Sequence, residues 1–400
     1  MGLKSILSIF RRKGMTSSDL LKIIVEQNRS KAGVAVNDTT ALKVATVFAC
    51  LRVISEGVAQ VPLKIFFSDG ENRVDAKSHS LYDILHRQPN DIQTSFGFRE
   101  TLVIHAALTG NGYAYIVRDP STRKIFEIIN LVPSMVKTNE AENIGDKPTY
   151  RVYGKKGDYL DLPKDKILHV QGPSWDGVSG MNSVAVAREA IGLSLTTEEA
   201  HSRLHKNGSH PGGLLSVEGS LDSEQYKQLR KWIDENHGGV GNSGRDMILD
   251  HAAKYTSMAM TGVDSQHIET RRFQIEEVCR FFRVMPIMVM QSDKAATYAS
   301  SEQMFLAHVI HTLMPWYQRL EETFDTQLLT KDDRRKGYYV KFVHQGLLRG
   351  ALKDTAEYLY KLISIGMMTR NEGRKVLELD PIDGLDEPLT PVNLMGVQNE

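Results

Sequence analysis

Hydrophobic residues repeat at helical spacing in two long, neighbouring stretches of the chain. The first stripe, from Asp264 to Met285, recurs at intervals of seven, four and three residues, which predicts an amphipathic helix. We expect it to end at Pro286, because proline has no amide donor. A second stripe with spacings of three and four starts at Leu306, includes Ile310 and Leu313, and runs to Leu328. Ser300 and Gln303 fit a capping box at its start.

Polar residues mark the edges of these two helices. Arg272, Glu276 and Arg280 step by four along the first helix and alternate in sign, so they pair either within the helix or between subunits. The segment Gln291–Ser300 is small and polar, without apolar periodicity, and Pro315 predicts a kink in the second helix. A short polar loop between two long helices suits a mechanical element, or equally an ordinary helical hairpin in a core.

The first 181 residues mix helix and strand patterns without regular alternation. This pattern predicts an α+β domain with antiparallel hairpins and disfavours a doubly wound nucleotide-binding fold. Ser95 is the expected cap of its third helix. Helices are predicted over residues 40–61, His79–His86 and Phe96–Leu108, and strands over Val61–Phe67, Tyr113–Val117, Ile125–Leu131, Tyr150–Val152 and Lys166–His169.

After Gly180 the pattern becomes mainly helical, starting with a long helix over Val184–Lys206. A strand–helix–strand insert follows, bordered by glycines. Its strands are Leu214–Val217 and Asp246–Met260, and its helix is Leu221–Asn236, capped by Ser220 or Asp222. Further on, the sequence predicts a strand over Tyr338–Phe342, helices over Ala351–Ile365 and Arg370–Leu379 with Thr369 as the cap of the last, and an extended tail from Pro381.

Composition and charge narrow the class of protein. The chain has 400 residues, 41% of them hydrophobic and 24% charged, which is typical of a soluble protein with several modules. Its 49 basic and 49 acidic residues cancel, which argues against gripping nucleic acid through a general positive field. Cys50 and Cys279 are the two cysteines, so a reducing cytosol is expected. No apolar run is long enough for a membrane span, and residues 1–35 are interpreted as a mobile arm.

Candidate catalytic motifs are weak. Gly239–Gly244 matches G-x-G-x-x-G, but a helix precedes it and a strand follows, the reverse of the dinucleotide fingerprint. The pairs His201 and His205, and His308 and His311, have helical spacing, yet neither has a convincing third metal ligand. We interpret these histidines as surface or core residues. The sequence therefore predicts no catalytic site, no metal and no cofactor.

Four stretches together resemble the portal proteins of tailed bacteriophages with HK97-type capsids. Their order and spacing carry the resemblance, which spans residues from about 40 to 395. The stretches are Thr40–Ser55, Leu108–Tyr115, Met285–Gln303 and Gly366–Gly384.

This resemblance implies a portal-type α+β fold and a ring of usually twelve copies at one capsid vertex. Double-stranded DNA passes through such a ring without sequence specificity. The implied partners are the terminase large subunit, the major capsid protein or scaffold, and a head-completion or adaptor protein, with no membrane partner. The expected location is the virion, after assembly in the host bacterial cytoplasm, and the expected role is not enzymatic.

The resemblance also assigns a part to each segment. Residues 1–35 are the arm and 36–181 the wing. The stem helices are 182–207 and 264–285, with the clip at 208–263 between them. The tunnel loop is 286–300, the long wing helix and a returning strand are 301–345, and the crown with an extended tail is 346–400.

Three groups of site residues follow from the resemblance. A loop beside moving DNA should be small and weakly charged, and Asp293 and Lys294 cancel one another; Tyr298 either contacts DNA or, the interpretation we favour, anchors the loop base. The expected tunnel-loop residues are Gln291, Ser292, Asp293, Lys294, Ala295, Ala296, Thr297 and Tyr298. The expected stem-interface residues are Arg272, Glu276 and Arg280, and the expected clip residues are Tyr226, Arg230, Trp232, Asn242 and Arg245.

Two other functions are alternatives. One is a metal-dependent nucleic-acid-processing enzyme of phage or prophage origin, with the histidines as ligands. The other is a purely structural oligomer through which no DNA passes.

Overall fold

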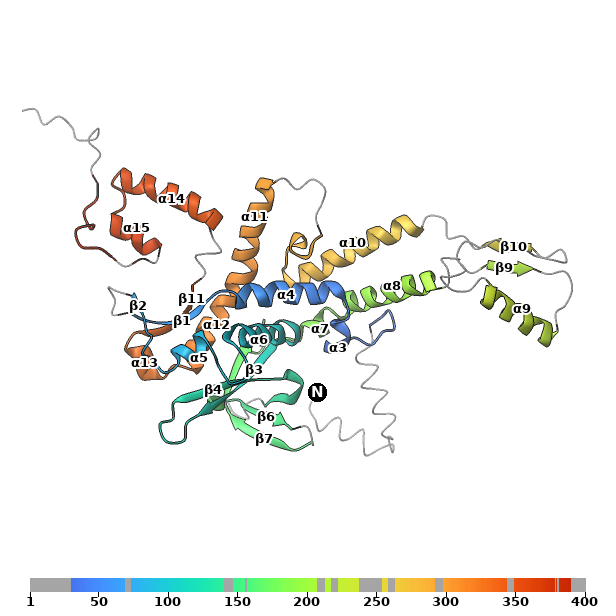
Figure 1. The fold of residues 1–400 in the computed structure, drawn as a ribbon, viewed down its shortest axis with the longest axis horizontal. Helices are drawn as coiled ribbons and strands as arrows, with labels where there is room; N and C mark the ends of the chain where they lie inside the picture. The colour runs from blue at the N-terminus through green and yellow to red at the C-terminus, as the bar shows by residue number, and fades with distance from the viewer. Residues whose placement is uncertain are drawn as a thin grey trace, which may run out of the picture. The chain divides into compact units, whose positions relative to one another are not determined.

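The computed structural model shows helices joined to small antiparallel sheets (Figure 1). It describes residues 30–68, 73–139, 147–154, 157–206, 213–216, 222–236, 254–257, 263–291, 298–343, 349–377, 379 and 381–389. The chain divides into one unit of residues 1–47 and 184–278 and another of residues 48–183 and 279–400. Every strand pair within these described ranges is antiparallel. The predicted α+β class is confirmed.

The larger unit is built on a three-stranded sheet of order β4-β3-β8. Its strands are β3 (Asn111–Arg118), β4 (Ile125–Leu131) and β8 (Ile167–Gln171). Helix α6 (Ser95–Thr109) packs on β3. The two come so close at Gly112 that a Cβ there would lie 2.6 Å from the Leu102 carbonyl oxygen, which requires glycine.

The cap of α6 differs from the prediction. The Thr94 hydroxyl accepts the hydrogen bond of the Gly97 amide, so Thr94 is the N-cap and the helix starts at Ser95. The Ser95 hydroxyl instead donates to the Leu85 carbonyl oxygen. Both residues suit a cap by type, and the backbone register decides between them.

A second sheet, of order β5-β6-β7, shares a core with the first. Its strands are β5 (Val136–Asn139), β6 (Thr149–Tyr153) and β7 (Tyr159–Pro163). Two short 3₁₀ turns, at Pro133–Met135 and Lys164–Lys166, precede β5 and β8. The shared cluster of buried side chains contains Tyr113, Tyr150, Leu162 and Ile167. Burial of these large side chains holds the two sheets together.

The third sheet, β11-β1-β2, joins the two ends of this unit's sequence. It consists of β1 (Leu63–Ser68), β2 (Arg73–Asp75) and β11 (Tyr338–Phe342), so the predicted strands at both ends are confirmed. Helices α5 (Tyr82–His86) and α13 (Lys331–Arg335) pack against it. The Tyr317 hydroxyl donates to the Gly57 carbonyl oxygen at 2.7 Å, which joins α12 (Met314–Gln327) to α4 (Ala45–Ala59).

The helix predicted over residues 40–61 is divided in two. Asn37 caps a short helix, α3 (Asp38–Ala41), and a turn precedes α4 (Ala45–Ala59). On α4, Cys50 is fully buried, and its Sγ lies 3.9 Å from that of Cys279. Both thiols are free, and their mutual contact, together with burial, raises the pKa of Cys50.

The smaller unit contains two long helices, α8 (Arg188–Lys206) and α10 (Val263–Phe282). The Gln274 amide donates to the Thr197 hydroxyl at 3.1 Å, which joins them. The helix predicted from Val184 is interrupted at Ala187, after α7 (Ser183–Val186). A strand pair, β9 (Gly213–Ser216) and β10 (Lys254–Ser257), and helix α9 (Ser223–Asn236) belong to the same unit.

Residues 30–37 are also part of the smaller unit. Ser30 is buried, and the Lys31 amide donates to the Glu189 carboxylate at 3.0 Å. A Cβ at Gly192 would collide with the Ser30 hydroxyl. The glycine therefore allows the segment that begins at Ser30 to pack closely against α8. Residues 30–35, predicted to belong to a mobile arm, are therefore packed against α8, and the rest of the predicted arm lies outside the described residues.

The end of α10 is not set by Pro286, contrary to the prediction. The helix stops at Phe282, and Arg283 adopts a left-handed conformation with φ of 56°. The Val284 amide donates to the Cys279 carbonyl at 2.9 Å, and the Arg283 amide to the Arg280 carbonyl at 3.1 Å. These two bonds form a Schellman motif. Pro286 instead begins a 3₁₀ turn, Pro286–Val289.

The second long helix is interrupted by a π-helical segment. It consists of α11 (Tyr298–His308), the π segment Val309–Leu313 and α12 (Met314–Gln327). Ser300 lies inside α11, so the predicted capping box is wrong. The wider π turn also displaces the buried face: Val309 is fully buried, whereas Ile310, predicted in the apolar stripe, is 46% exposed.

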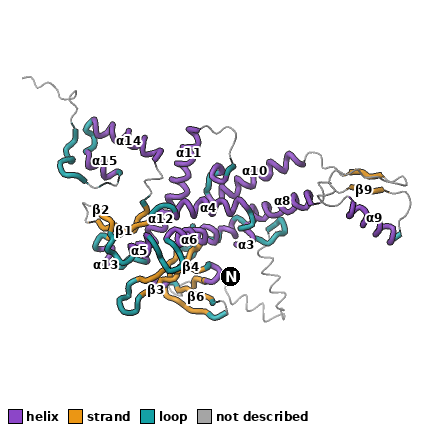
Figure 2. Tube along the Cα trace, in the orientation of Figure 1, coloured by secondary structure: helices purple, strands orange, loops and turns teal. Residues whose placement is uncertain are grey.

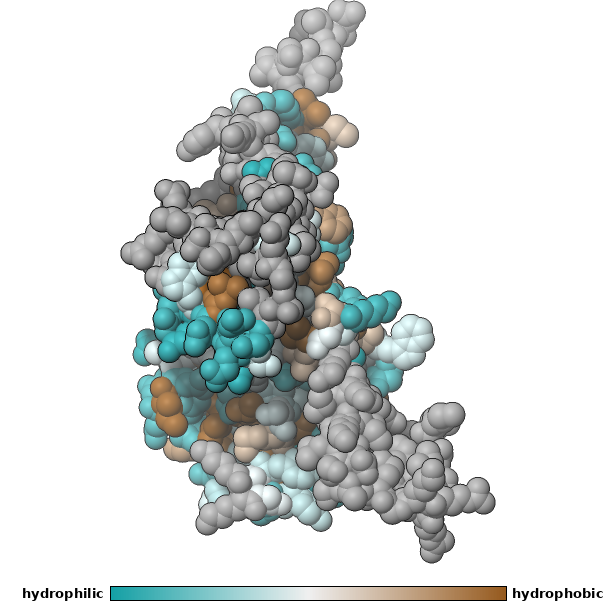
Figure 3. Space-filling view, turned by 90° about the vertical axis from the view of Figure 1, so that its right-hand side faces the viewer, coloured by the Kyte–Doolittle hydropathy of each residue, from teal (hydrophilic) through white to brown (hydrophobic). Residues whose placement is uncertain are grey.

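The C-terminal part forms a helical pair. Helix α14 (Arg349–Ser364) is followed by α15 (Arg370–Val376), capped by Thr369 as predicted. The tail is not simply extended, because the Asn371 side chain donates to the Ile382 carbonyl and to Asp386 at 2.9 and 2.8 Å. None of the described helices is long and apolar enough to cross a membrane. Figure 2 shows these helices and the short strands along the chain, and in Figure 3 hydrophobic and hydrophilic side chains are interspersed on the described surface.

Candidate functional site

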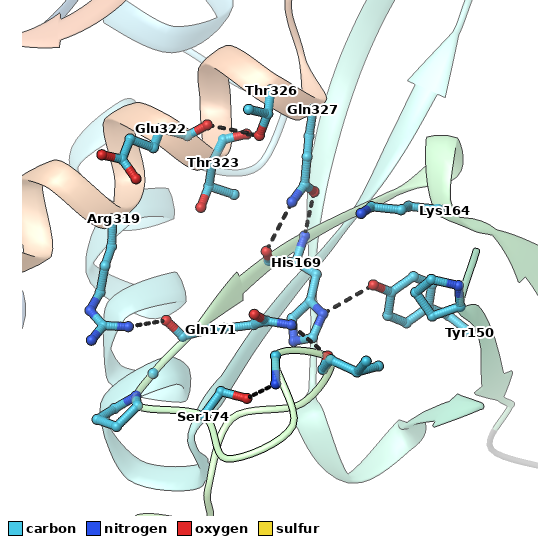
Figure 4. Close-up of a pocket in the computed structure, with 15 residues that line it drawn as sticks. Tyr150, Lys164, His169, Gln171, Ser174, Arg319, Glu322, Thr323, Thr326 and Gln327 are labelled. Atoms are coloured by element: carbon cyan, nitrogen blue, oxygen red, sulfur yellow. Dashed lines mark hydrogen bonds between the residues drawn. The ribbon is translucent and has the colours of Figure 1, made fainter. Parts of the chain in front are cut away.

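A polar pocket opens in the larger unit between β8, α12 and the loop that follows β8 (Figure 4). Its volume is about 520 Å³. Lys164, His169 and Gln171 come from β8 and the turn before it, and Arg319 and Glu322 from α12. Ser174, Gly177 and Val178 contribute the loop. The volume is in the range of small-molecule sites.

His169 is hydrogen-bonded to residues on three other elements around the pocket. Its ring nitrogens lie 3.0 Å from the Tyr150 hydroxyl (Nδ1) and 2.9 Å from Asn111 Oδ1 (Nε2). Its backbone exchanges two hydrogen bonds with the Gln327 side chain, at 2.9 and 3.2 Å. One residue thus connects β8 to β6, β3 and α12, as the dashed lines in Figure 4 show in part.

The partners of His169 assign its tautomer. Asn111 Oδ1 already accepts the Gly180 amide at 2.7 Å, so it is an acceptor and His169 Nε2 must donate. Nδ1 then accepts the Tyr150 hydroxyl, and the imidazole is neutral. Burial, with a smaller effect of Lys164, lowers the pKa of His169 to about 4. Both ring nitrogens of the neutral imidazole are engaged in hydrogen bonds. His169 therefore cannot act as a base without breaking this network.

The loop from Gly172 to Gly180 is held tightly at the rim of the pocket. The Asp176 carboxylate accepts the amides of Ser179 and Val178, both at 2.8 Å, and these bonds lower the pKa of Asp176. At the loop base, a Cβ on Gly180 would collide with the Gly110 carbonyl oxygen. The loop is therefore a preformed structure, not an adaptable one.

The pocket's chemistry suits recognition better than catalysis. Arg319 donates to the Gln171 carbonyl oxygen at 3.0 Å, and its guanidinium lies 5.9 Å from the Trp316 ring centre. Burial lowers the pKa of Arg319. Neither Arg319 nor Lys164 forms an ion pair with any residue that the structure describes. Two cations without acidic partners are suited to a carboxylate-bearing partner.

The structure does not support a metal site at the histidine pairs of the alternative enzyme hypothesis. His308 is buried, which lowers its pKa to about 4, whereas His311 is exposed. The side chain of His205 lies outside the described part of the structure. Within the described residues, no three His, Cys, Asp or Glu side chains gather where they would hold a metal ion.

The three predicted site groups lie on different elements. Arg272, Glu276 and Arg280 are exposed on α10, as are Tyr226 and Trp232 on α9, where Arg230 donates to the Tyr226 hydroxyl at 3.4 Å. Gln291 follows the Pro286–Val289 turn, and Tyr298 begins α11. The residues that lie outside the described part are Ser292, Asp293, Lys294, Ala295, Ala296, Thr297, Asn242 and Arg245.

The sequence did not point to the His169 pocket. Its one visible signal is the Gly110-Asn111-Gly112 run, a composition that is typical of a turn. The partners of His169 come from two strands and a helix, up to 158 positions away, so no local pattern brings them together.

Comparison with known proteins places this architecture in a family. Residues 45–378 match the family described as phage portal protein. The portal protein of Enterobacteria phage HK97 is 28% identical over 376 residues, covering 92% of this chain and 87% of that protein.

Two solved structures share the fold. The neck of a native gene transfer agent particle, computed with C12 symmetry, has a TM-score of 0.58 at 21% identity, covering 91% of this chain and 99% of that one. The crystal structure of an HK97 family portal protein from Corynebacterium diphtheriae has a TM-score of 0.56 at 18% identity, covering 77% and 95%. Since the family match covers most of its length, this chain belongs to the phage portal protein family.

Proposed function

We propose that this chain is the subunit of a portal ring, the connector at one vertex of a phage-type capsid. The observation that carries the proposal is the family match over residues 45–378, which includes both long helices of the smaller unit and the sheets of the larger one. A subunit number of twelve is supported by the C12 symmetry of the gene transfer agent neck with the same fold.

DNA passage is the second part of the proposal. Passage through a ring requires a channel wall that does not hold phosphates tightly, and the chain's zero net charge fits this requirement. We assign Gln291–Tyr298 to the wall, because this segment joins the end of the α10 region to the start of α11. Its acid and base, Asp293 and Lys294, cancel.

The remaining groups are assigned to protein contacts. Arg272, Glu276 and Arg280 lie exposed on α10, where they face a neighbouring copy in the proposed ring. No ion pair between Arg272 and Glu276 occurs among the described contacts, which favours pairing of these two side chains between subunits. Tyr226, Arg230 and Trp232 on α9 form the proposed contact with terminase and, later, with a head-completion protein.

The role in this proposal is structural, within the virion. The pocket residues Lys164, His169 and Arg319 hold the fold or meet protein partners and carry out no reaction. We place the outer contacts of the larger unit with capsid protein or scaffold.

The decisive experiment is the mass and symmetry of the purified chain, by native mass spectrometry and electron microscopy. A closed ring of about twelve copies with a central hole wide enough for duplex DNA is the expected result. A chain that remains monomeric both alone and with co-expressed capsid protein would refute the proposal.

A deletion tests DNA passage separately. Removing Asp293–Thr297 spares α11, which starts at Tyr298, so rings should still form while DNA packaging by the cognate terminase is lost. Replacing Asp293 and Lys294 together by serine keeps loop length and net charge, and it should leave packaging intact. Normal packaging after the deletion would support a structural oligomer without a DNA-contacting loop.

A further inference from the structure

The two cysteines of this chain are in contact with one another. Cys50 and Cys279 are the only cysteines among the 400 residues, and 229 positions separate them in the sequence. Their Sγ atoms are nevertheless 3.9 Å apart, and both side chains are fully buried. A single buried cysteine acts as a small apolar side chain. Two that meet across separate helices have a second possibility, a covalent bond.

The helices that carry the cysteines are held by one common support, the π segment together with α12. On one side, the Tyr317 hydroxyl donates to the Gly57 carbonyl oxygen of α4 at 2.7 Å. On the other side, the Thr312 hydroxyl donates to the carbonyl oxygen of Arg283, in the turn directly after α10. All four residues and both cysteines belong to the larger unit. The contact of the two sulfur atoms is therefore part of one packed core.

The distance between the sulfur atoms leaves a disulfide within reach. A disulfide requires the two Sγ atoms to approach to about 2.0 Å, so each atom must move by about 1 Å from its present position. Rotation about the Cα–Cβ bonds supplies a movement of this size. The structure holds both residues as thiols, and the bond forms only when an oxidant is present.

We propose that Cys50 and Cys279 are an oxidation site, at which a peroxide converts the two thiols into one disulfide within the chain after the assembled particle leaves the cell. The cytosol keeps thiols reduced, whereas the medium outside a cell does not. The released particle as the place of oxidation rests on the proposed function. The contact between the two sulfur atoms stands without it.

The reaction balances with one molecule of hydrogen peroxide. One cysteine sulfur attacks a peroxide oxygen, the O–O bond breaks, and a sulfenic acid and one water form. The second cysteine sulfur attacks the sulfenic sulfur, the S–O bond breaks, and the S–S bond forms as a second water leaves. The two sulfurs together lose two electrons, which the two peroxide oxygens gain, and both thiol protons end in the water molecules.

The reaction is expected to be slow. The thiolate is the reactive form of cysteine, and the contact with Cys279, together with burial, raises the pKa of Cys50. Peroxide also has to reach two fully buried side chains, which requires a transient opening of the core. Slow oxidation suits a pair that stays reduced during assembly in the cell and becomes oxidised in a long-lived particle.

The disulfide ties the last turn of α10 covalently to α4. The Cys279 carbonyl oxygen accepts the Val284 amide at 2.9 Å, so the bonded residue is itself part of the turn that leads to Pro286–Val289 and Gln291. In the proposed function this turn is the base of the channel-wall segment. Oxidation therefore anchors one end of that segment more firmly.

Treatment of the purified chain with hydrogen peroxide tests the bond. Intact mass is measured, and thiols are counted by alkylation in denaturant. The expected product is lighter by about 2 Da, has lost both thiols, migrates faster on a non-reducing gel and returns to the starting state with dithiothreitol. The oxidised chain should also unfold about 5 °C or more above the reduced chain, because the bond joins positions 229 residues apart.

Cys50→Ala and Cys279→Ala are matched controls, because each leaves one cysteine in the chain. Neither variant can form the bond, so its unfolding temperature should be the same with and without dithiothreitol after peroxide treatment. Circular dichroism verifies that both variants are folded. The comparison of oxidised with reduced wild type needs neither variant.

Particles test the place of oxidation. Chains alkylated with N-ethylmaleimide before lysis should carry a label on each cysteine, whereas released particles kept in peroxide-containing medium should yield linked Cys50 and Cys279 peptides. Cysteines already linked in the cell, or still reduced in these particles, would overturn the place of oxidation.

The remaining contrary results separate the oxidation site from the ring. Rings whose two thiols survive peroxide, or give only sulfinic acid or bonds between chains, would overturn the site and leave the proposed function intact. Equal unfolding temperatures of oxidised and reduced wild type would overturn the anchoring. A chain that forms the disulfide but never a ring would support the site and overturn the proposed function.

Discussion

The neutral state of His169 predicts a specific loss of stability in acid. In the folded chain burial lowers its pKa to about 4 from the ordinary value of 6.5. Between these two values the unfolded chain binds a proton at this residue and the folded chain does not, so the free energy of unfolding falls as the pH falls. At about 1.4 kcal/mol per pH unit, the interval corresponds to about 3 kcal/mol.

The assay is the pH dependence of urea unfolding in wild type and in His169→Gln. Glutamine retains a donor toward Asn111 but does not titrate, so between pH 6.5 and 4 the variant should lose about 3 kcal/mol less than wild type. The comparison is necessary because Asp325 acts in the opposite direction. Burial raises its pKa to about 6, so its protonation stabilises the folded state as the pH falls.

A matched variant separates burial from hydrogen bonding. Tyr150→Phe removes the hydroxyl that His169 Nδ1 accepts at 3.0 Å but retains the ring that buries the imidazole. It should lower stability by about 1 kcal/mol at every pH and leave the acid dependence unchanged. The His169 ring resonance, assigned by its absence in His169→Gln, gives a direct measurement. A titration midpoint near 6.5 in the folded protein would refute the reasoning.

Three further predictions concern packing and backbone geometry, each measured by thermal or urea unfolding. Leu313→Ala should destabilise by about 2–5 kcal/mol, and Ile310→Ala by less than about 1 kcal/mol, because the π turn buries the first side chain and exposes the second; equal effects would place the π segment wrongly. Gly180→Ala should cost about 3 kcal/mol or more, since its Cβ collides with the Gly110 carbonyl, whereas Gly97→Ala, with only ordinary contact at 3.6 Å, should be neutral or stabilising. Thr94→Ala should lower stability by about 1 kcal/mol, because it removes the N-cap of α6. An unchanged unfolding midpoint would indicate that Ser95 is the cap.

Hydrophobic periodicity predicted the elements well where packing repeats along one face. The strands Ile125–Leu131 and Tyr338–Phe342 have the predicted limits. The cap of α15 at Thr369 is also as predicted, because a capping box is a local interaction that sequence alone specifies.

The errors occur where backbone geometry departs from a regular helix. A π turn adds a residue without any change in composition, so the stripe through Ile310 looked continuous in the sequence. The division of α3 from α4 has a similar origin, since residues 40–61 retain an apolar face across the turn. Hydrophobic periodicity therefore does not predict where a helix is interrupted by a turn or by a π-helical segment.

The pocket was not predictable for a different reason. His169 depends on Asn111, Tyr150 and Gln327, which three separate elements bring together. Each is an ordinary residue in its own stretch, and only the tertiary fold makes them a network. The family resemblance supplied the architecture, but it offered no information about this site.

The Schellman turn at Arg283 has a consequence for how the end of α10 responds to substitution. A left-handed arginine is strained by about 1 kcal/mol relative to glycine, so Arg283→Gly relaxes the backbone. The same exchange removes a positive charge from the helix C-terminus, where the aligned peptide dipoles favour a cation by a similar amount at low salt. The balance between the two terms thus depends on ionic strength: as salt screens the dipole, the glycine variant gains on the arginine.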